Sequence, residues 1–485
     1  MRAFKRKSVT GAASYFMRSI FLQAIGFASI LVLSAYFDPE DFGIYGIVLS
    51  IIGILMFFSD VGLASTLIQK KDEPTLNEYR SLFTVQFALS LVILLVCIAV
   101  AMSEVLVAKT GVVGNYILLA LGVSFPLATL KTIPSVILER ELLFSKLVVP
   151  QIVEQICFHA VLIWLAISGW GVFAYIPAVL IRSTVGVLAM YFIQRWQIGF
   201  STDWPTLKSL LGFGLKFQLN DFLARIKDQL FFLVLGYILP LKENGYVQWA
   251  KTQSMVPYNL TVNNVMAITF PAYSRLQGHP KQLQAAVEKS LFFITLAIFP
   301  ILCGMALFIT PLLVLFPTYA KWQPAIPSFI FFTLSIGWSS ISSPLTTTLT
   351  AIGQINYTLK LMIVWTALTW ILSPLLLIWF GFTGIAAAAL IISFSSILSV
   401  WYAKRFVTLR VWEQVWRQLF AAIVMATVGI LGGSFWLRSV WWLLFGMGLT
   451  VGTYGVVLLA LGKDVFFSQV RSLLAVRSEK IAISE

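Results

Sequence analysis

Charged residues are scarce in this chain: they make up 11% of its 485 residues, whereas soluble domains carry about 25%. Hydrophobic residues make up 59%, and no stretch longer than about thirty residues is polar enough to fold in water. A chain with so few polar groups cannot cover a globular surface with them. We therefore expect lipid to surround most of the chain, and we expect no soluble domain.

Several chemical signatures are missing as well. The three cysteines, Cys97, Cys157 and Cys303, are isolated in apolar segments and show neither metal-ligand spacing nor a disulfide framework. The sequence has no glycine-rich phosphate loop, no nucleophile elbow and no carboxylate pair in a polar context. We expect no metal site, no cofactor and no enzymatic activity.

Apolar runs of about 20 residues, separated by turn residues or charges, predict the membrane spans. Each run is predicted to be an α-helix, because every backbone polar group must be satisfied within lipid. Fourteen runs fit: 12–36, 42–64, 80–103, 113–133, 147–168, 171–193, 209–238, 244–269, 290–316, 324–350, 357–380, 382–402, 417–437 and 440–461. The sequence therefore predicts an all-α polytopic membrane protein with about 14 transmembrane helices.

The distribution of basic residues supports this count. With the amino terminus placed inside, 25 of the 34 Lys and Arg residues fall in cytoplasmic segments or at their edges, and four fall outside. Cytoplasmic segments of membrane proteins carry such an excess. Both termini are therefore predicted to be cytoplasmic. Since topology explains the net charge of +14, that charge gives no support for a nucleic-acid partner.

Two segments repeat one another. DFGIYGIVLS (41–50) and ENGYVQWAKT (243–252) align with Gly43 opposite Gly245, at an offset of 202. The copies lie six predicted helices apart, an even number, so they point the same way. Parallel repeats of this kind are typical of transporters, whose substrate site lies between the halves. The predicted parts are a six-helix N-lobe, a six-helix C-lobe, two further helices and a cytoplasmic tail: 1–208, 209–410, 411–462 and 463–485.

Three stretches resemble a known family. DPEDFGIYGIVLSIIGILMFFSDVGLASTLIQKKD (38–72) is similar to the amino-terminal signature of bacterial polysaccharide-transport proteins, and both 241–277 and LTAIGQINYTLK (349–360) fit the same family. These are lipid-linked oligosaccharide flippases of the multidrug/oligosaccharidyl-lipid/polysaccharide exporter superfamily.

The resemblance implies a two-lobed helical bundle in the bacterial cytoplasmic (inner) membrane. It implies that the chain moves undecaprenyl-diphosphate-linked glycans from the inner to the outer leaflet, for capsule, O-antigen or exopolysaccharide biosynthesis. The expected partners are this polyprenyl-diphosphate-linked glycan, membrane lipids and polysaccharide polymerase machinery. The family has no invariant catalytic signature, so the resemblance identifies no site residues.

Charges lie near the middle of the seventh predicted span, in NDFLARIKDQL (220–230). Each unpaired charge at that depth costs at least about 2.5 to 3.5 kcal/mol. On a helix, Asp221, Arg225 and Asp228 share one stripe. Lys227 lies on a second stripe. One interpretation is a buried triad in which the carboxylates neutralise Arg225. The other, favoured by the separate position of Lys227, is a polar face that lines a water-filled cavity and meets a charged substrate.

Other spans also carry cations: Arg18 in the first, Arg182 in the sixth and Lys251 in the eighth. Glu154 and His159, in the fifth span, are the expected partners of Arg182. Embedded cations outnumber embedded carboxylates: Arg18, Arg182, Arg225, Lys227 and Lys251 against Glu154, Asp221 and Asp228. A positive excess suits a diphosphate, because Arg binds phosphate oxygens in a bidentate manner and Lys binds them as a point charge. We expect these five cations to line a substrate-binding cavity.

The carboxylates Asp221, Asp228 and Glu154 suggest a second role in ion coupling or charge pairing. A carboxylate that titrates or binds Na⁺ would release Arg225 in one transport state and hold it in the other. The membrane potential, worth about 2.3 kcal/mol per charge per 100 mV, would reset a cationic site equally well. Coupling to H⁺ or Na⁺ and a voltage drive are therefore both open.

Two other functions are considered. A cation-coupled multidrug exporter of the same superfamily should have about twelve spans and an acidic or neutral cavity, in contrast to the cationic excess here. A membrane enzyme acting on lipid-linked glycans would need a sizeable loop outside the membrane, and the longest loops here have about fifteen to twenty residues. Neither alternative fits as well as a flippase.

Overall fold

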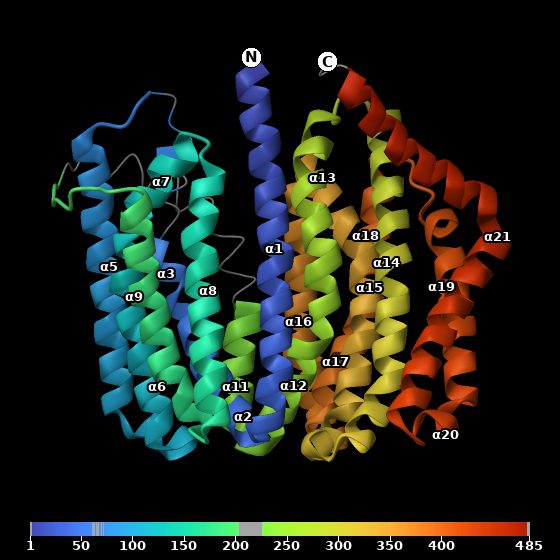
Figure 1. Ribbon diagram of the computed structural model, residues 1–485, viewed down its shortest axis with the longest axis horizontal. Coiled ribbons are helices and arrows are strands. Elements are labelled where there is room, and N and C mark those ends of the chain that lie inside the picture. The colour runs from blue at the N-terminus through green and yellow to red at the C-terminus, as the bar shows by residue number, and fades with distance from the viewer. Residues whose placement is uncertain are drawn as a thin grey trace. The chain divides into compact units, whose positions relative to one another are not determined.

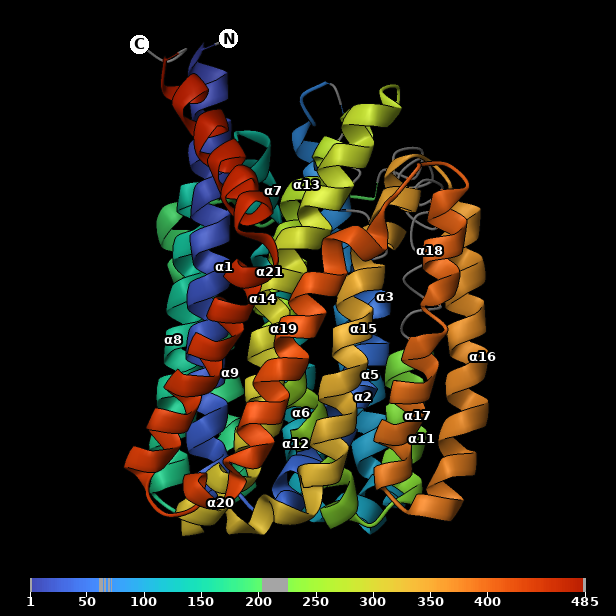
Figure 2. The same ribbon diagram turned by 90° about the vertical axis from the view of Figure 1, so that its right-hand side faces the viewer.

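The computed structural model describes residues 2–60, 64, 67–68, 70, 72–202 and 226–482. These ranges contain helices, turns and loops and no strand, which confirms the predicted all-α class. Contacts divide the chain into two compact units, residues 1–249 and 250–485, and each unit is described by itself. Figures 1 and 2 show the ribbon from two directions, coloured from blue at the N-terminus to red at the C-terminus.

The helices of the first unit are α1 (Arg2–Tyr36), α2 (Pro39–Leu55), α3 (Phe57–Asp60), α5 (Leu76–Met102), α6 (Glu104–Leu130), α7 (Thr132–Arg140), α8 (Phe144–Ile167), the 3-10 helix η1 (Gly171–Ala174), α9 (Tyr175–Ile193), the π-helix η2 (Ile226–Leu230) and α11 (Phe231–Ile238). Helix α12 (Leu241–Tyr258) begins in the first unit and ends in the second.

The remaining helices of the second unit are the π-helix η3 (Asn259–Asn263), α13 (Asn264–Arg275), α14 (Pro280–Leu315), the 3-10 helix η4 (Pro317–Ala325), α15 (Ile326–Ala351), α16 (Ile355–Phe380), α17 (Thr383–Phe394), α18 (Ile397–Lys404), α19 (Val411–Leu431), α20 (Gly433–Trp436) and α21 (Val440–Ala482).

The described part of the chain has 12 segments that are helical, long and apolar enough to cross a membrane, from Met17–Tyr36 to Val440–Asp464. They coincide with twelve of the predicted spans. The seventh predicted span, 209–238, lies mostly outside the described residues. The eighth, 244–269, falls on α12, η3 and α13, outside those 12 segments. The total of fourteen therefore stays a prediction, as does the cytoplasmic position of both termini.

Within the first unit, α8 packs between α1 and α9, and α6 packs between α5 and α9. Figures 1 and 2 both show α5, α6, α8 and α9 running side by side. Helix α2 lies against α6 and α11. A buried apolar cluster joins the start of α5 to α7 through Leu82, Phe83, Ile133 and Val136. Apolar residues thus fill the contact between α5 and α7.

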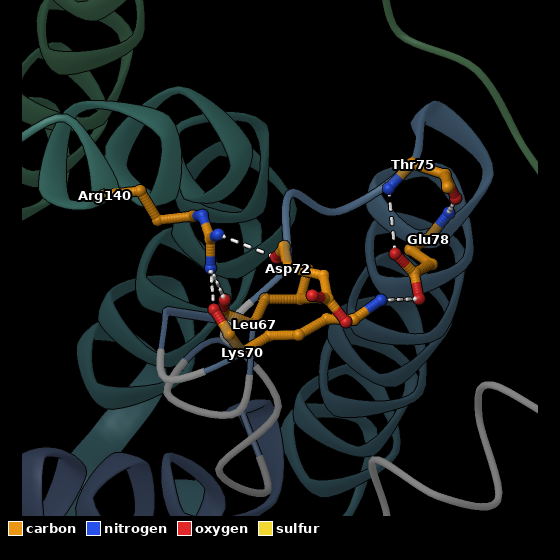
Figure 3. Close-up of polar contacts among 6 residues, drawn as sticks. All are labelled: Leu67, Lys70, Asp72, Thr75, Glu78 and Arg140. Carbon is orange, nitrogen blue, oxygen red and sulfur yellow. Dashed lines mark hydrogen bonds and ion pairs between the residues drawn. The ribbon is translucent and has the colours of Figure 1, made fainter.

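Arg140, the last residue of α7, holds the chain that leads into α5 (Figure 3). Its guanidinium donates hydrogen bonds to the backbone carbonyl oxygens of Leu67, Lys70 and Asp72. The Lys70 ammonium in turn pairs with the Glu78 carboxylate at 2.5 Å. An arginine suits this position because its planar fork offers five donors, whereas a lysine offers a point charge.

Helices α2 and α12 cross with their backbones in close contact. A methyl group at Gly43 would overlap the carbonyl oxygen of Leu241 and lie 3.3 Å from the backbone nitrogen of Gly245. A methyl group at Gly245 would overlap the carbonyl oxygen of Pro39 and lie 3.2 Å from the backbone nitrogen of Gly43. Only glycine permits so close an approach at these two positions.

The residues in these two contacts are related by the sequence offset of 202. Adding 202 to Pro39 and Gly43 gives Leu241 and Gly245, so each contact is the counterpart of the other. A second matched pair lies nearby: the Trp249 indole N–H donates to the Ser34 hydroxyl at 2.9 Å. By the same offset, Ser34 corresponds to Gly236 and Trp249 corresponds to Ile47. These two counterparts are also in contact, because a methyl group added to Gly236 would lie 2.6 Å from the Cγ1 atom of Ile47. The repeated segments therefore meet about a local twofold axis.

In the second unit, α14 packs against α15, α19 and α21, while α17 packs against α15 and α16. Buried residues of α14 and α19, among them Leu291, Ile298 and Met425, belong to one apolar cluster. The long helix α21 is interrupted at Gly462, and helical backbone continues from there into the predicted tail 463–485 as far as Ala482. The predicted lobe boundary between 208 and 209 lies outside the described residues, so the lobe limits stay a prediction.

Candidate functional site

Helix α8 carries the polar side chains around which the candidate site is built. Gln151, Glu154 and Phe158 follow one another at spacings of three and four residues, which places them on one face of the helix. The three side chains contact a residue of α1, the residue that follows α6, and a residue of α9, respectively. This face of α8 is therefore the part of the first unit where charged residues from several helices gather.

Arg18, on α1, meets the first of these side chains. Its guanidinium Nη1 donates a hydrogen bond to the amide oxygen of Gln151. This bond fixes the position of the guanidinium beside α8. Arg18 is half-buried and lies near the start of the span Met17–Tyr36.

Glu154 forms an ion pair with Lys131, which follows the last residue of α6. The Lys131 Nζ atom lies 2.5 Å from the Glu154 Oε2 atom, and the two side chains are only 19% and 12% exposed. Gly186, on α9, faces this pair: a methyl group there would overlap the carboxylate and lie 3.0 Å from the ammonium nitrogen. The charge pairing proposed for Glu154 thus has a defined geometry, with a partner at the end of the predicted span 113–133.

Arg182 lies midway along the span Gly171–Ile193. Its guanidinium carbon stands 5.4 Å from the centre of the Phe158 ring, and its charge acts on Tyr45 and His159. Among the side chains that the structure describes, no carboxylate pairs with Arg182. The expected pairing with Glu154 is wrong, because the nearer Lys131 neutralises that carboxylate.

The surroundings of Arg182 are aromatic and only partly polar. Tyr45 stacks on Tyr175 with ring centres 3.6 Å apart. The His159 Nδ1 atom is buried and has no hydrogen-bond partner in the described ranges. An aromatic face attracts a cation by about 0.5 to 2 kcal/mol, which is less than the cost of an unneutralised charge at mid-span. A ligand or water with an acceptor group would satisfy Arg182, and one that also has a donor group would satisfy His159 in either tautomer.

The seventh predicted span shows one of its charge pairs. The Lys227 Nζ atom lies 2.9 Å from an Asp228 carboxylate oxygen, with the side chains 23% and 49% exposed. These neighbours were expected on different stripes of an α-helix. The backbone here is π-helical, with hydrogen bonds to the fifth residue and a wider turn, so α-helical stripes do not apply. Asp221 and Arg225 lie outside the described residues.

Lys251 is half-buried on α12 and belongs to the second unit. Within the first unit, the structure brings Arg18, Glu154 and Arg182 to the α8 face or beside it. Gln151, Lys131 and Gly186 complete this arrangement, and the sequence reasoning missed all three. Gln151 had a usable signal, since an amide three residues before an embedded carboxylate shares its helical face.

Solved structures with a similar fold are membrane transporters. The inward closed conformation of the lipid II flippase MurJ aligns with a TM-score of 0.74 and 16% identity, covering 95% of this chain and 100% of that one. An inward-facing multidrug resistance transporter of the MATE family aligns with a TM-score of 0.62 and 13% identity, covering 79% of this chain and 95% of that one. At these identities the comparison shows the fold alone.

Curated relatives are similar at the sequence level. The succinoglycan biosynthesis transport protein ExoT of Rhizobium meliloti (strain 1021) is 22% identical over 330 residues, which cover 68% of this chain and 66% of that protein. The lipopolysaccharide biosynthesis protein WzxC of Escherichia coli (strain K12) is 23% identical over 368 residues, covering 74% and 73%.

A family profile gives the assignment. Residues 32–327, more than half of the chain, match the profile described as "Polysaccharide biosynthesis protein". This stretch includes both copies of the repeat, the α8 face and Arg182. The chain therefore belongs to this polysaccharide biosynthesis protein family.

Proposed function

We propose that the chain is a flippase that moves undecaprenyl-diphosphate-linked oligosaccharide repeat units from the inner to the outer leaflet of the bacterial cytoplasmic membrane by alternating access. Family membership, the similarity to the transport protein ExoT and the fold shared with a lipid II flippase support this proposal. The product would be used for a capsule, O-antigen or exopolysaccharide.

The observation that carries the proposal is Arg182. A cation at mid-span costs about 2.5 to 3.5 kcal/mol even by the lowest scales. No described carboxylate offsets this cost, although Glu154 is on the neighbouring helix. A diphosphate passing through the membrane brings the missing negative charge and accepts bidentate hydrogen bonds from a guanidinium. Arg182 is therefore assigned to the head group, while the polyprenyl tail stays in lipid.

The other embedded cations differ in how much structural support they have for a contact with the diphosphate. Arg18, held by Gln151 on the α8 face, is assigned a second contact with the diphosphate. Lys227 is paired with Asp228, so it contributes little net charge unless that pair opens. Arg225 and Lys251 keep their assignment to substrate binding on sequence grounds alone.

The carboxylates are assigned to coupling in the same way. Protonation of Glu154 would release Lys131 from its ion pair and change the packing of α6, α8 and α9 around Gly186. Asp228 and Asp221 are the alternative sites for H⁺ or Na⁺. The coupling site is tested by measuring transport in liposomes under separately imposed pH, Na⁺ and voltage gradients. If the Glu154→Gln variant responds to all three gradients as the wild type does, Glu154 is not the coupling site.

The test is a flipping assay with purified protein in liposomes and a fluorescent undecaprenyl-diphosphate oligosaccharide. We expect Arg182→Gln to lower the flipping rate at least tenfold, with Arg182→Lys in between, because one charge-assisted contact is worth about 1.5 to 3 kcal/mol. The control is Arg438→Gln, which removes an arginine that also lies over an aromatic ring, Phe435, at 4.5 Å, but outside the spans. Equal rates for wild type and Arg182→Gln would refute the site.

The second candidate function is a multidrug exporter, because the fold is also similar to a transporter of the MATE family. An unneutralised arginine at mid-span argues against it, since that charge repels an organic cation. If the wild type fails to flip the lipid-linked glycan and instead exports organic cations, the exporter replaces the flippase.

A further inference from the structure

The eighth predicted span carries amides near its middle. Helical backbone runs without a break from Leu241 to Arg275 through α12, η3 and α13, a path of about 50 Å at 1.5 Å per residue. This path is longer than the hydrocarbon core, which is about 30 Å thick. It is nevertheless too polar to belong to the 12 apolar segments, and Asn259, Asn263 and Asn264 lie close to its midpoint. Polar side chains at such a depth face protein or water rather than lipid.

One of the three amides holds the backbone. Asn264 is only 7% exposed. Its Nδ2 atom donates to the backbone carbonyl oxygens of Asn259 at 3.3 Å and of Leu260 at 3.0 Å. These bonds support the π-helical turn η3, and single π-turns inside α-helices are frequent at functional sites. The Tyr258 and Ser343 hydroxyls also share a hydrogen bond, so the turn is fixed against α15.

The other two amides keep polar atoms that a ligand can reach. The Asn263 Nδ2 atom donates to the Asn259 Oδ1 atom at 2.8 Å. Asn263 is exposed and Asn259 is half-buried. The Asn259 Nδ2 atom and the Asn263 Oδ1 atom have no hydrogen-bond partner in the described part of the chain, and neither atom is sealed from the surface. We call these two residues the asparagine pair. The pair offers an accessible donor beside an accessible acceptor.

The helices that hold the asparagine pair are uncharged. Residues 252–274 contain no Asp, Glu, Lys, Arg or His, and neither does α15, which packs against α13. A phosphate therefore finds no charge-assisted hydrogen bond on these helices, and an organic cation finds no carboxylate. An amide donates and accepts hydrogen bonds, as a sugar hydroxyl does. The asparagine pair thus suits a neutral ligand that is rich in hydroxyl groups.

We propose that the asparagine pair binds sugar hydroxyl groups of the lipid-linked glycan. This inference rests on the proposed function, and it assigns the glycan, rather than the diphosphate, to residues of the second unit. One sugar hydroxyl accepts from the Asn259 amide nitrogen, and a second donates to the Asn263 amide oxygen. A site built to bond hydroxyl groups discriminates against ligands that lack them, because its own polar atoms are then left unpaired. The pair therefore contributes to the choice of glycan.

The experiment measures the binding of two ligands to the purified full-length protein in a neutral detergent, by native mass spectrometry. One ligand is undecaprenyl diphosphate that carries a neutral oligosaccharide, and the other is undecaprenyl diphosphate alone. Asn259→Leu and Asn263→Leu each remove an amide and keep a side chain of similar shape. Each should weaken binding of the glycan-carrying ligand about threefold to tenfold, which is the effect of one neutral hydrogen bond. Binding of undecaprenyl diphosphate alone should not change.

Three further variants serve as controls. Asn356→Leu changes an exposed asparagine on α16, outside the pair, and should bind both ligands as the wild type does. Arg182→Gln should weaken both ligands, since both carry the diphosphate. Asn264→Leu removes two hydrogen bonds to the π-helical turn and should lower the unfolding midpoint. Asn263→Leu should leave that midpoint unchanged, because its side chain is exposed.

The results that would overturn the inference differ from those that would overturn the proposed function. If both leucine variants of the pair bind both ligands as the wild type does, the pair makes no contact with sugar. If they weaken both ligands equally, their effect is on the fold rather than on the glycan. In either case the flippase proposal stands. If the wild type binds neither ligand, the flippase proposal itself fails.

Discussion

The crossing of α2 and α12 gives the sharpest prediction about stability. In Gly43→Ala the new methyl group overlaps the Leu241 carbonyl oxygen and lies 3.3 Å from the Gly245 nitrogen. Both neighbours are backbone atoms, so no side chain can turn aside and the two helices must separate. Overpacking costs about 1 to 3 kcal/mol, with backbone overlap at the upper end. Helix propensity favours alanine by about 0.8 to 1 kcal/mol, so the expected net loss is about 2 kcal/mol.

The assay is thermal unfolding of the purified protein in detergent, followed by tryptophan fluorescence. The control is Gly26→Ala on α1, where an added methyl group meets nothing within 4 Å. It should raise the free energy of unfolding by up to about 1 kcal/mol through propensity alone. Gly43→Ala should lower the unfolding midpoint and Gly26→Ala should raise it or leave it unchanged. Equal shifts in the two variants would refute the close crossing.

A double-mutant cycle tests the twofold relation as well. Gly245→Ala should destabilise by the same mechanism, through Pro39. Once one methyl group has separated the helices, the second meets less resistance. The combined variant should therefore cost less than the sum of the single changes. Strict additivity would mean that the two glycines do not share one contact.

Three further predictions concern charged groups of the first unit. Arg140→Lys loses the guanidinium fork on three carbonyls, so its unfolding free energy should fall by about 1 to 3 kcal/mol, and an unchanged midpoint would contradict the role seen in Figure 3. Glu154→Gln leaves the ammonium of Lys131 unpaired and should lower the free energy of unfolding by about 3 kcal/mol. Adding Lys131→Gln in the same chain should recover most of this loss. A double variant as unstable as the single one would argue against the pair. Burial raises the pKa of Glu139, on α7 outside the spans, above its ordinary value. Ionisation therefore favours the unfolded chain as pH rises above the ordinary glutamate pKa, so Glu139→Gln should be more stable than wild type at pH 8 and equal to it at pH 4, whereas an equal difference at both values would exclude this titration.

The sequence predicts the helical architecture well because the constraint is local. Twelve predicted spans coincide with helices, since lipid demands both an apolar run and internal hydrogen bonding at each of them. The offset that pairs Gly43 with Gly245 is also visible in the sequence. Their mutual contact is not, because equivalence in a repeat gives no distance between the copies.

The candidate site was predicted only in part. Arg182 and Glu154 stand out because charges are rare in apolar spans, but their partners depend on how far each helix is rotated and shifted against its neighbours. Lys131 pairs with Glu154 because α6 ends beside that turn of α8, and no spacing along one helix reveals this. For Lys227, the separate stripe stays a prediction, because Asp221 and Arg225 lie outside the described residues and the turn that holds Lys227 and Asp228 is π-helical.

A contact in which a residue meets its own repeat counterpart is the contact that two identical subunits make at a twofold axis. In such a homodimer every substitution appears twice, so a bulky residue cannot be placed on one side of the axis alone. A single chain removes this restriction. Trp249 now faces Ser34, while Ile47 occupies the same position opposite Gly236. A single chain that carries both copies thus permits a hydrogen bond on one side of the crossing and an apolar contact on the other.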